Sequence, residues 1–273
     1  MPTPCLPFAS CPDADLIRLH GIFTDIDDTL TAHGAIAPEA MQALHALRAA
    51  RVPVIAITGR PMGWSEGFAG TWPVAAIVAE NGAVALIPDA GGVQVEYAQD
   101  AATREHNAQR LRDVAARVLA DVPGTTLAQD SAGRVTDIAI DHSEFTQLPQ
   151  AAIAQAVAIM QSAGMNASVS SIHINGWFGE HDKLSGARWM LRRLFQRDLA
   201  AEMARWVYVG DSTNDQTMFA AFPLSVGVAN LMRFAGQLHT WPAYITTGER
   251  GVGFAEVAAR VLAARTIGTD SGR

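Results

Sequence analysis

An apolar run turns into a cluster of carboxylates at Ile22-Phe23-Thr24-Asp25-Ile26-Asp27-Asp28-Thr29. The β-branched and aromatic side chains at its start predict a buried strand. Since side chains two residues apart at a strand end project to the same side, Asp25 and Asp27 are expected to face one pocket while Ile26 packs behind them. An ordinary acidic turn is the alternative for this segment taken alone.

This pair of carboxylates suits a site that transfers a phosphoryl group. One carboxylate can attack phosphorus while the other carries a proton. Because the attacking group and the phosphate are both anionic, the attack requires a cation that offsets their repulsion. The pair therefore predicts a bound divalent metal, and Mg²⁺ suits it because no histidine or cysteine cluster is evident for zinc.

Two later apolar runs also end in polar segments. Val54-Ile55-Ala56-Ile57 leads into Thr58-Gly59-Arg60-Pro61, where a hydroxyl and turn amides could bind phosphate oxygens. Trp206-Val207-Tyr208-Val209 leads into Gly210-Asp211-Ser212-Thr213-Asn214-Asp215, a second acidic strand end. Ligands of open α/β sheets collect beyond the carboxyl ends of the strands. The three strand ends are therefore expected to meet in one crevice.

Lys183 is the only lysine among the 20 lysine and arginine residues of the chain. A composition that favours arginine wherever either residue serves retains lysine where a compact ammonium is needed. Such a place lies beside a carboxylate nucleophile and a small phosphate. Chance survival of one lysine is the alternative, but the acidic strand ends favour a functional role.

In this order, the four segments resemble the motifs of the haloacid dehalogenase superfamily, in its magnesium-dependent phosphatase branch. The first motif matches Asp25-Ile26-Asp27-Asp28-Thr29, and the second matches Thr58 in Thr58-Gly59-Arg60. The third matches Lys183, and the fourth matches Gly210-Asp211-Ser212-Thr213-Asn214-Asp215. One departure is Asp28, where many relatives carry glycine; its side chain is expected to cap local amides.

Two further segments, Glu80-Asn81-Gly82-Ala83 and Asp182-Lys183, resemble one subgroup of this superfamily. Its members carry a large α/β cap between the second and third motifs. The subgroup includes sucrose-phosphate, trehalose-phosphate and mannosyl-3-phosphoglycerate phosphatases, and also phosphomannomutases. The resemblance thus implies a phosphatase with a cap over its active site.

The resemblance also implies a role for each motif residue. Asp25 would be the nucleophile that forms an aspartyl-phosphate, and Asp27 the acid that protonates the leaving alcohol and then activates water. Mg²⁺ would be held by Asp25, the backbone carbonyl of Asp27 and Asp211. Asp215 would orient the waters of the metal or Lys183. The transferring phosphoryl group would be bound by the remaining motif groups, Thr58, Gly59, Lys183 and Asn214.

The substrate class implied by the resemblance is a small phosphorylated metabolite, most simply a sugar phosphate. Polar side chains suit sugar hydroxyls and an indole suits the face of a sugar ring, which makes candidates of Arg134, His173, Asn175 and Trp177. Packing or local hydrogen bonding is the alternative for each. Arg60 would either bridge the core to the substrate or satisfy local carbonyls.

Two other functions remain open. A phosphomutase of the phosphomannomutase type would use the same Asp25 intermediate and return the phosphate to another hydroxyl. A sugar-phosphate binding protein without activity is also conceivable, although simple binding gives Asp27 no obvious use.

The length of 273 residues and the net charge of −7 limit the class of protein. The acidic balance argues against a nucleic-acid or anionic-membrane partner, because both select a basic face. No apolar run approaches the about 20 residues that span a bilayer. The first basic residue is Arg18, unlike a secretory signal, so a cytoplasmic protein is expected. The oligomeric state is not predicted.

Strands and helices alternate along the chain, which predicts an α/β fold with a Rossmann-like parallel-sheet core and a smaller α+β cap. The core is expected to be discontinuous, covering residues 19–87 and 177–265. Residues 1–18 are expected to form a loose leader. Its two cysteines, Cys5 and Cys11, are expected to be free thiols, with a disulfide or a metal pair as alternatives.

Within the core, helices are expected at residues 38–50 and, after Lys183, through Phe195. The cap is expected at residues 88–176, where it would close over the site and exclude water. Its pattern predicts helices at 103–119 and 148–163 and strands at 134–141 and 167–174.

Overall fold

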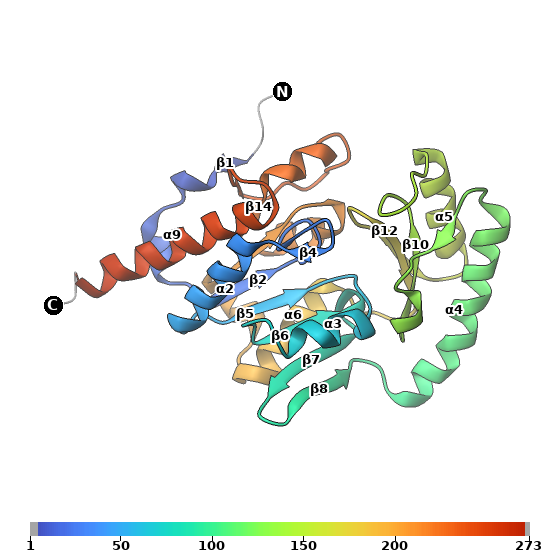
Figure 1. Cartoon of the computed structure of the whole chain (residues 1–273), viewed down its shortest axis with the longest axis horizontal. Coiled ribbons are helices and arrows are strands. Elements are labelled where there is room, and N and C mark those ends of the chain that lie inside the picture. The colour runs from blue at the N-terminus through green and yellow to red at the C-terminus, as the bar shows by residue number, and fades with distance from the viewer. Residues whose placement is uncertain (1–4, 271–273) are drawn as a thin grey trace.

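The computed structural model describes residues 5–270, which form a large sheet and a smaller one with their helices (Figure 1). The large sheet has the strand order β1-β15-β14-β13-β2-β5-β6-β7-β8. All neighbours from β1 to β6 are parallel, whereas β7 and β8 form an antiparallel extension. These strands are β1 (Leu6–Pro7), β2 (Gly21–Thr24), β5 (Val54–Ile57), β6 (Ala76–Ala79), β7 (Val84–Asp89), β8 (Gly92–Tyr97), β13 (Trp206–Gly210), β14 (Leu224–Gly227) and β15 (Tyr244–Ile245). The predicted α/β fold is confirmed.

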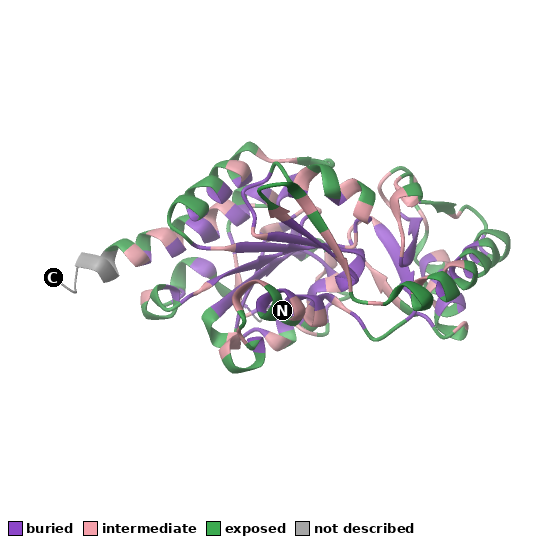
Figure 2. Ribbon diagram, turned by 90° about the horizontal axis from the view of Figure 1, so that it is seen from below, coloured by how far each residue is buried: buried purple, intermediate pink, exposed green. Residues whose placement is uncertain are grey.

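Strand β2 is buried on both faces, as its uninterrupted apolar sequence requires. Ile22 belongs to the core cluster on one side of the sheet, together with Leu44. Phe23 points into the opposite cluster, with its ring 4.9 Å from Trp206 and 5.7 Å from Phe222. Figure 2 shows the buried strands between helices with exposed outer faces. Burying each such side chain stabilises the fold by about 1.5–3 kcal/mol, which holds the end of β2 in place.

Helices cover both faces of the large sheet. The cluster with Leu44 is built by α1 (Asp13–Ile17), α2 (Pro38–Ala49), α3 (Met62–Ala69) and α9 (Arg250–Asp270). The opposite face is covered by α6 (Lys183–Phe195), α7 (Leu199–Glu202) and α8 (Gln216–Ala221). The short hairpin of β3 (Thr31–Ala32) and β4 (Ala35–Ile36) joins β2 to α2. Across residues 5–270, none of the helices combines the length and apolar character that crossing a membrane requires.

The expected loose leader is wrong for residues 5–18. Strand β1 pairs in parallel with β15, and Pro7 is tolerated there because an edge strand leaves one side unpaired. Phe8 is fully buried and meets Tyr244 edge-on, with ring centroids 6.0 Å apart. Cys5 and Cys11 are free thiols, as expected, but both are buried, and burial raises the pKa of each.

The insertion forms a separate lobe beside the large sheet (Figure 1). Its sheet has the order β11-β12-β10-β9, and α4 and α5 share one core cluster with it. These elements are α4 (Ala101–Asp121), β9 (Thr126–Leu127), β10 (Asp137–Asp141), α5 (Gln150–Ser162), β11 (Asn166–Val169) and β12 (His173–Trp177). The small α+β unit predicted for the cap is therefore present.

Two details of the predicted cap are wrong. The segment from Pro88 to Tyr97 belongs to the large sheet, because β8 pairs with β7 along its whole length. The single strand expected at residues 167–174 is a hairpin instead, in which β11 pairs antiparallel with β12. Apolar and polar residues alternate on both sides of Ser170-Ser171 and only this pair interrupts the pattern, so the reversal of the chain was missed.

Candidate active site

The three polar strand ends meet at the carboxyl edge of the large sheet, because β2, β5 and β13 are parallel and adjacent. The ladder continues one residue beyond two of these strands. The backbone N–H of Asp25 donates to Val209 O at 2.8 Å, and that of Thr58 donates to Val78 O at 2.8 Å. Asp25 and Thr58 are therefore held by sheet hydrogen bonds rather than by mobile loops.

Asp25, Asp211 and Asp215 form a buried acidic cluster, with carboxylate oxygens within 4.8 Å of one another. Lys183 enters this cluster from α6, and its Nζ lies 2.7 Å from Asp25 Oδ1 and 2.7 Å from Asp215 Oδ1. Burial alone would lower the pKa of Lys183, but Asp215 and Asp25 raise it above its ordinary value. The ammonium therefore remains charged beside the carboxylates.

Asp215 is fully engaged by protein donors. Its Oδ1 accepts from Lys183 and from the Tyr208 hydroxyl, and its Oδ2 accepts the backbone N–H of Asp211 at 2.9 Å. Gly210 allows this approach, since a Cβ there would lie 2.5 Å from Asp215 Oδ2. Asp215 thus orients Lys183 and the turn that carries Asp211.

The remaining carboxylates suit a divalent cation with oxygen ligands. Asp211 is buried, and its Oδ1 has no hydrogen-bond partner within the described part of the chain. Burial and the neighbouring carboxylates, Asp25 first, raise the pKa of Asp211 well above its ordinary value. Burial also raises the pKa of Asp25 to about 7, although Lys183 lowers it. A hard cation bound by Asp25 and Asp211 would relieve this repulsion, so these residues fit Mg²⁺.

Helix α6 positions Lys183 at its first residue. The N-cap Asp182 accepts the Ser185 N–H at 2.6 Å, and the Ser185 hydroxyl receives the Asp182 N–H at 2.8 Å. This reciprocal capping fixes the direction in which the helix begins. Gly82, with φ of 108°, lets the backbone of Asp182 approach, because a Cβ there would lie 2.1 Å from Asp182 O.

Asp27 points away from the acidic cluster toward the second motif. Its Oδ1 lies 2.9 Å from Arg60 Nε, and its Oδ2 accepts from the Thr58 hydroxyl at 3.5 Å. Thr58 Oγ1 also accepts the backbone N–H of Arg60 at 3.0 Å. The side chain of Asp27 is thus separate from the expected metal ligands, as a proton carrier would be.

A cavity of 430 Å³ lies between the edge of the large sheet and the insertion. The core lines it with acidic groups, including Asp27 and Asp211, and with basic groups, including Arg60 and Arg250. The insertion contributes Ser143, Glu144, Phe145, Ser171 and Ile172. The cavity therefore combines polar groups with apolar side chains, next to Asp27, the expected proton carrier, and Asp211, an expected metal ligand.

Four of the predicted substrate or phosphate residues have protein partners. Asn214 Oδ1 accepts from the Ser212 hydroxyl at 2.9 Å, and His173 Nε2 lies 2.8 Å from Glu144 Oε2. Asn175 Nδ2 donates to Gly59 O at 3.2 Å. Trp177 Nε1 donates to the backbone oxygen of His181 at 2.8 Å, and the indole of Trp177 stacks on the imidazole ring of His181. Trp177 and Asn214 line a second cavity of 790 Å³, together with Lys183.

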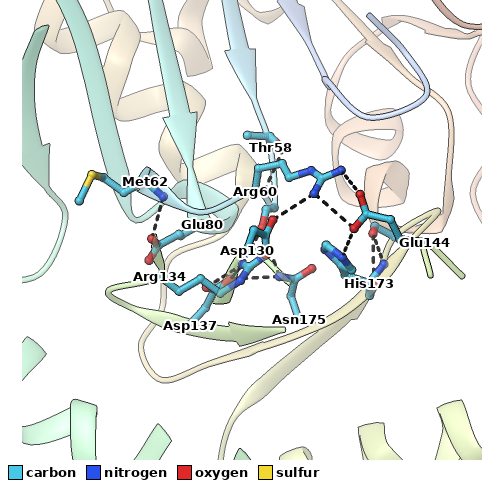
Figure 3. Close-up of polar contacts among 12 residues, drawn as sticks. Thr58, Arg60, Met62, Glu80, Asp130, Arg134, Asp137, Glu144, His173 and Asn175 are labelled. Carbon is cyan, nitrogen blue, oxygen red and sulfur yellow. Dashed lines mark hydrogen bonds and ion pairs between the residues drawn. The ribbon is translucent and has the colours of Figure 1, made fainter. Parts of the chain in front are cut away.

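Arg134 also lies between the insertion and the core. Its Nη1 is 2.9 Å from Asp137 Oδ1 and donates to Gly59 O at 2.9 Å, while its Nη2 is 3.1 Å from Asp130 Oδ1 (Figure 3). Asn175 therefore shares both Gly59 and Asp137 with Arg134. Through these contacts, the second motif is held by the insertion.

The sequence analysis missed several groups of this site. Asp28 pairs with Arg250 of α9, with Nε 2.7 Å from Oδ1, whereas a local amide was expected. Asn230 Nδ2 lies 3.3 Å from Asp211 Oδ2, and Glu144 contacts Arg60. Burial would raise the pKa of Glu144, but its contacts with His173 and Arg60 outweigh burial and lower the pKa to about 2. Among these groups, only Asp28 stood out in the sequence, because many relatives carry glycine at its position.

Comparisons with known proteins agree with this architecture. Residues 22–116 match the family model of haloacid dehalogenase-like hydrolases. A search of curated proteins found no match. The sucrose-phosphatase of Synechocystis, solved in complex with sucrose and phosphate, is 16% identical with a TM-score of 0.62, covering 89% of this chain and 98% of that chain.

Two other solved structures are similar over most of the chain. A putative HAD/COF-like hydrolase from Plasmodium vivax has a TM-score of 0.67 at 15% identity, covering 92% of this chain and 99% of that one. The C-terminal domain of trehalose-6-phosphate phosphatase from C. albicans has a TM-score of 0.62 at 13% identity, covering 93% and 96%. The predicted resemblance is therefore confirmed: the chain is similar to haloacid dehalogenase-like hydrolases, in sequence over residues 22–116 and in fold over most of its length.

Proposed function

We propose that this protein is a Mg²⁺-dependent phosphatase that hydrolyses a small phosphorylated metabolite, most simply a sugar phosphate. The observation that carries the proposal is the buried cluster of Asp25, Asp211, Asp215 and Lys183 beside a cavity that also contains Asp27. Three buried carboxylates around one ammonium leave an excess of negative charge. Such an arrangement is costly for folding and is typical of a site that binds a cation.

Each group in the cluster has a chemical role in this proposal. A carboxylate oxygen of Asp25 attacks phosphorus while the bond to the leaving oxygen breaks, which forms an aspartyl-phosphate. Asp27 gives its proton to the leaving oxygen and then takes a proton from the water that hydrolyses the intermediate. Lys183 and the Thr58 hydroxyl neutralise and orient the phosphoryl oxygens. Mg²⁺, held by Asp25 and Asp211, would supply further neutralisation of the phosphate charge.

A sugar phosphate is supported by two observations. The cavity offers hydroxyls and charged groups for sugar oxygens, along with Phe145 and Ile172 for an apolar ring face. Two of the similar structures are a sucrose-phosphatase, solved with sucrose and phosphate, and a trehalose-6-phosphate phosphatase.

The test is phosphate release from a panel of sugar phosphates, measured with Mg²⁺ and with EDTA. We expect Mg²⁺-dependent release from at least one member, and none from the Asp25→Asn variant prepared in the same way. That variant controls for contaminating phosphatases. Turnover that requires an added sugar bisphosphate, with no net phosphate release, would instead identify a phosphomutase. Release that survives chelation or the Asp25→Asn change would contradict the proposed mechanism.

A further inference from the structure

Arg60 is the point at which the core and the insertion share charged groups. Its side chain is 5% exposed, and its three guanidinium nitrogens face three different carboxylates. Nε lies 2.9 Å from Asp27 Oδ1, Nη1 lies 3.0 Å from Asp130 Oδ2, and Nη2 lies 2.7 Å from Glu144 Oε1. Figure 3 shows this guanidinium between the second motif and the insertion. Asp27 belongs to the core, whereas the other two carboxylates come from the insertion.

The two carboxylates from the insertion are themselves held in place. The backbone N–H of Glu144 donates to Asp141 Oδ1 at 2.9 Å. The side-chain Oε2 of Glu144 lies 2.8 Å from His173 Nε2 (Figure 3). Asp130 Oδ1 lies 3.1 Å from Arg134 Nη2. A planar guanidinium bound at all three nitrogens cannot rotate without breaking a charged hydrogen bond. The insertion therefore determines where Arg60 presents Nε to Asp27.

We propose that Glu144 and Asp130 are positioning residues, which align Asp27 for proton transfer by acting through Arg60. The inference rests on the proposed function, in which Asp27 donates a proton to the leaving oxygen. When the insertion is seated, Arg60 holds the Asp27 carboxyl in one orientation; without Glu144 or Asp130, Arg60 and Asp27 become free to reorient. The arrangement couples proton transfer to the presence of the insertion over the site.

A variant of Asp130 distinguishes a positioning role from direct binding of the substrate. Glu144 lines the 430 Å³ cavity and could also contact a substrate, but Asp130 is not among the residues that line this cavity. An effect of Asp130→Asn on proton transfer must therefore pass through Arg60 or Arg134. Both substitutions, Asp130→Asn and Glu144→Gln, keep the shape of the side chain and remove its charge. Glu105→Gln, on the exposed surface of α4, is the matched control.

The experiment compares two aryl phosphates of similar shape, p-nitrophenyl phosphate and phenyl phosphate. Nitrophenolate leaves readily without a proton, whereas phenolate is a much poorer leaving group and depends on the acid. In single-turnover measurements with Mg²⁺, Glu144→Gln and Asp130→Asn should slow release of phenol by roughly 10- to 100-fold, part of the 10²–10⁴-fold typical of general acid catalysis. Release of nitrophenol should change by less than about threefold, and Glu105→Gln should change neither.

A double-mutant cycle with Arg60→Gln completes the test. If both carboxylates act through Arg60, neither substitution should slow phenol release further in the Arg60→Gln background. Equal losses for both substrates, or a change confined to KM, would overturn the inference and leave the phosphatase activity of the unmodified protein intact. Failure of the unmodified protein to release phosphate from any member of the sugar-phosphate panel would instead contradict the proposed function. Circular dichroism and thermal melting identify a variant that fails to fold, in which case the other carboxylate variant decides.

Discussion

At the scale of single residues, the site is a balance of buried charges. Asp25 and Asp215 both contact the Lys183 ammonium, while one oxygen of Asp211 is buried without a hydrogen-bond partner in the described chain. Replacing one member by a neutral group of the same shape should therefore affect catalysis far more than folding.

The first prediction concerns Asp25→Asn. Turnover should fall below detection, because an amide cannot form the acyl-phosphate. The unfolding temperature should be unchanged or higher, because the substitution removes a carboxylate whose pKa burial raises to about 7. Phosphate release and thermal melting would be compared with Asp121→Asn, an exposed control on α4. Steady-state activity in Asp25→Asn would falsify the assignment of the nucleophile.

The second prediction concerns Lys183→Arg. The substitution keeps the charge, but a larger planar group must enter a site where the lysine is 4% exposed and contacts two carboxylates at 2.7 Å. We expect kcat to fall by about 100-fold or more, since a displacement of about 1 Å at an active site can cost that much. Normal kcat in this variant would mean that the site does not require a lysine and that Lys183 survived by chance. Steady-state kinetics would measure the loss.

The third prediction uses the chemistry of the lysine itself. An amine-selective reagent should modify Lys183 in the folded protein at least about tenfold more slowly than in urea, because each unit by which a pKa rises removes about tenfold of the reactive neutral amine. Modification should also track the loss of activity. Mass spectrometry would follow the labelled peptide. Rapid labelling of the folded protein without loss of activity would contradict the buried contacts with Asp25 and Asp215.

At the scale of elements, the start of α6 is the most sensitive point, because the helix begins at Lys183 itself. The fourth prediction is that Asp182→Ala lowers the free energy of unfolding by about 1 kcal/mol, the typical effect of losing an N-cap. It should also lower kcat, since a frayed first turn displaces the ammonium. Asp182→Ser retains an acceptor for the Ser185 N–H and is the matched control. Urea unfolding and phosphate release would separate the two effects. Equal behaviour of both variants would argue against a role for the N-cap hydrogen bond of Asp182.

At the scale of the whole molecule, the acidic cluster should link metal binding to stability. The fifth prediction is that Mg²⁺ raises the unfolding temperature, because a ligand at a hundredfold excess over its Kd stabilises the folded state by about 2.7 kcal/mol. Differential scanning calorimetry should show a smaller rise for Asp211→Asn, which removes one expected ligand. Activity should vanish with EDTA, and Ca²⁺ should inhibit because its coordination is looser. An equal rise in both proteins would place the metal elsewhere.

Local sequence patterns were enough to predict the class of fold and the residues that meet at the sheet edge. Buried parallel strands must be continuously apolar, so β5 was predicted within its observed bounds. The amphipathic pattern after Lys183 likewise predicted α6 up to its observed end at Phe195. Because parallel strands place their carboxyl ends together, the polar residues that follow could be assigned to one site. These features depend on local patterns and on general rules of topology.

The partners of Arg60 and Asp28, by contrast, depend on contacts between distant parts of the chain. Arg60 is separated from Asp130 by 70 residues and from Glu144 by 84, and Asp28 from Arg250 by 222. No periodicity or local motif encodes such pairings, since they arise when the insertion docks on the core and when α9 packs against α2 and β3. The same reason explains the leader, whose burial depends on β15 and α9, elements from the opposite end of the chain.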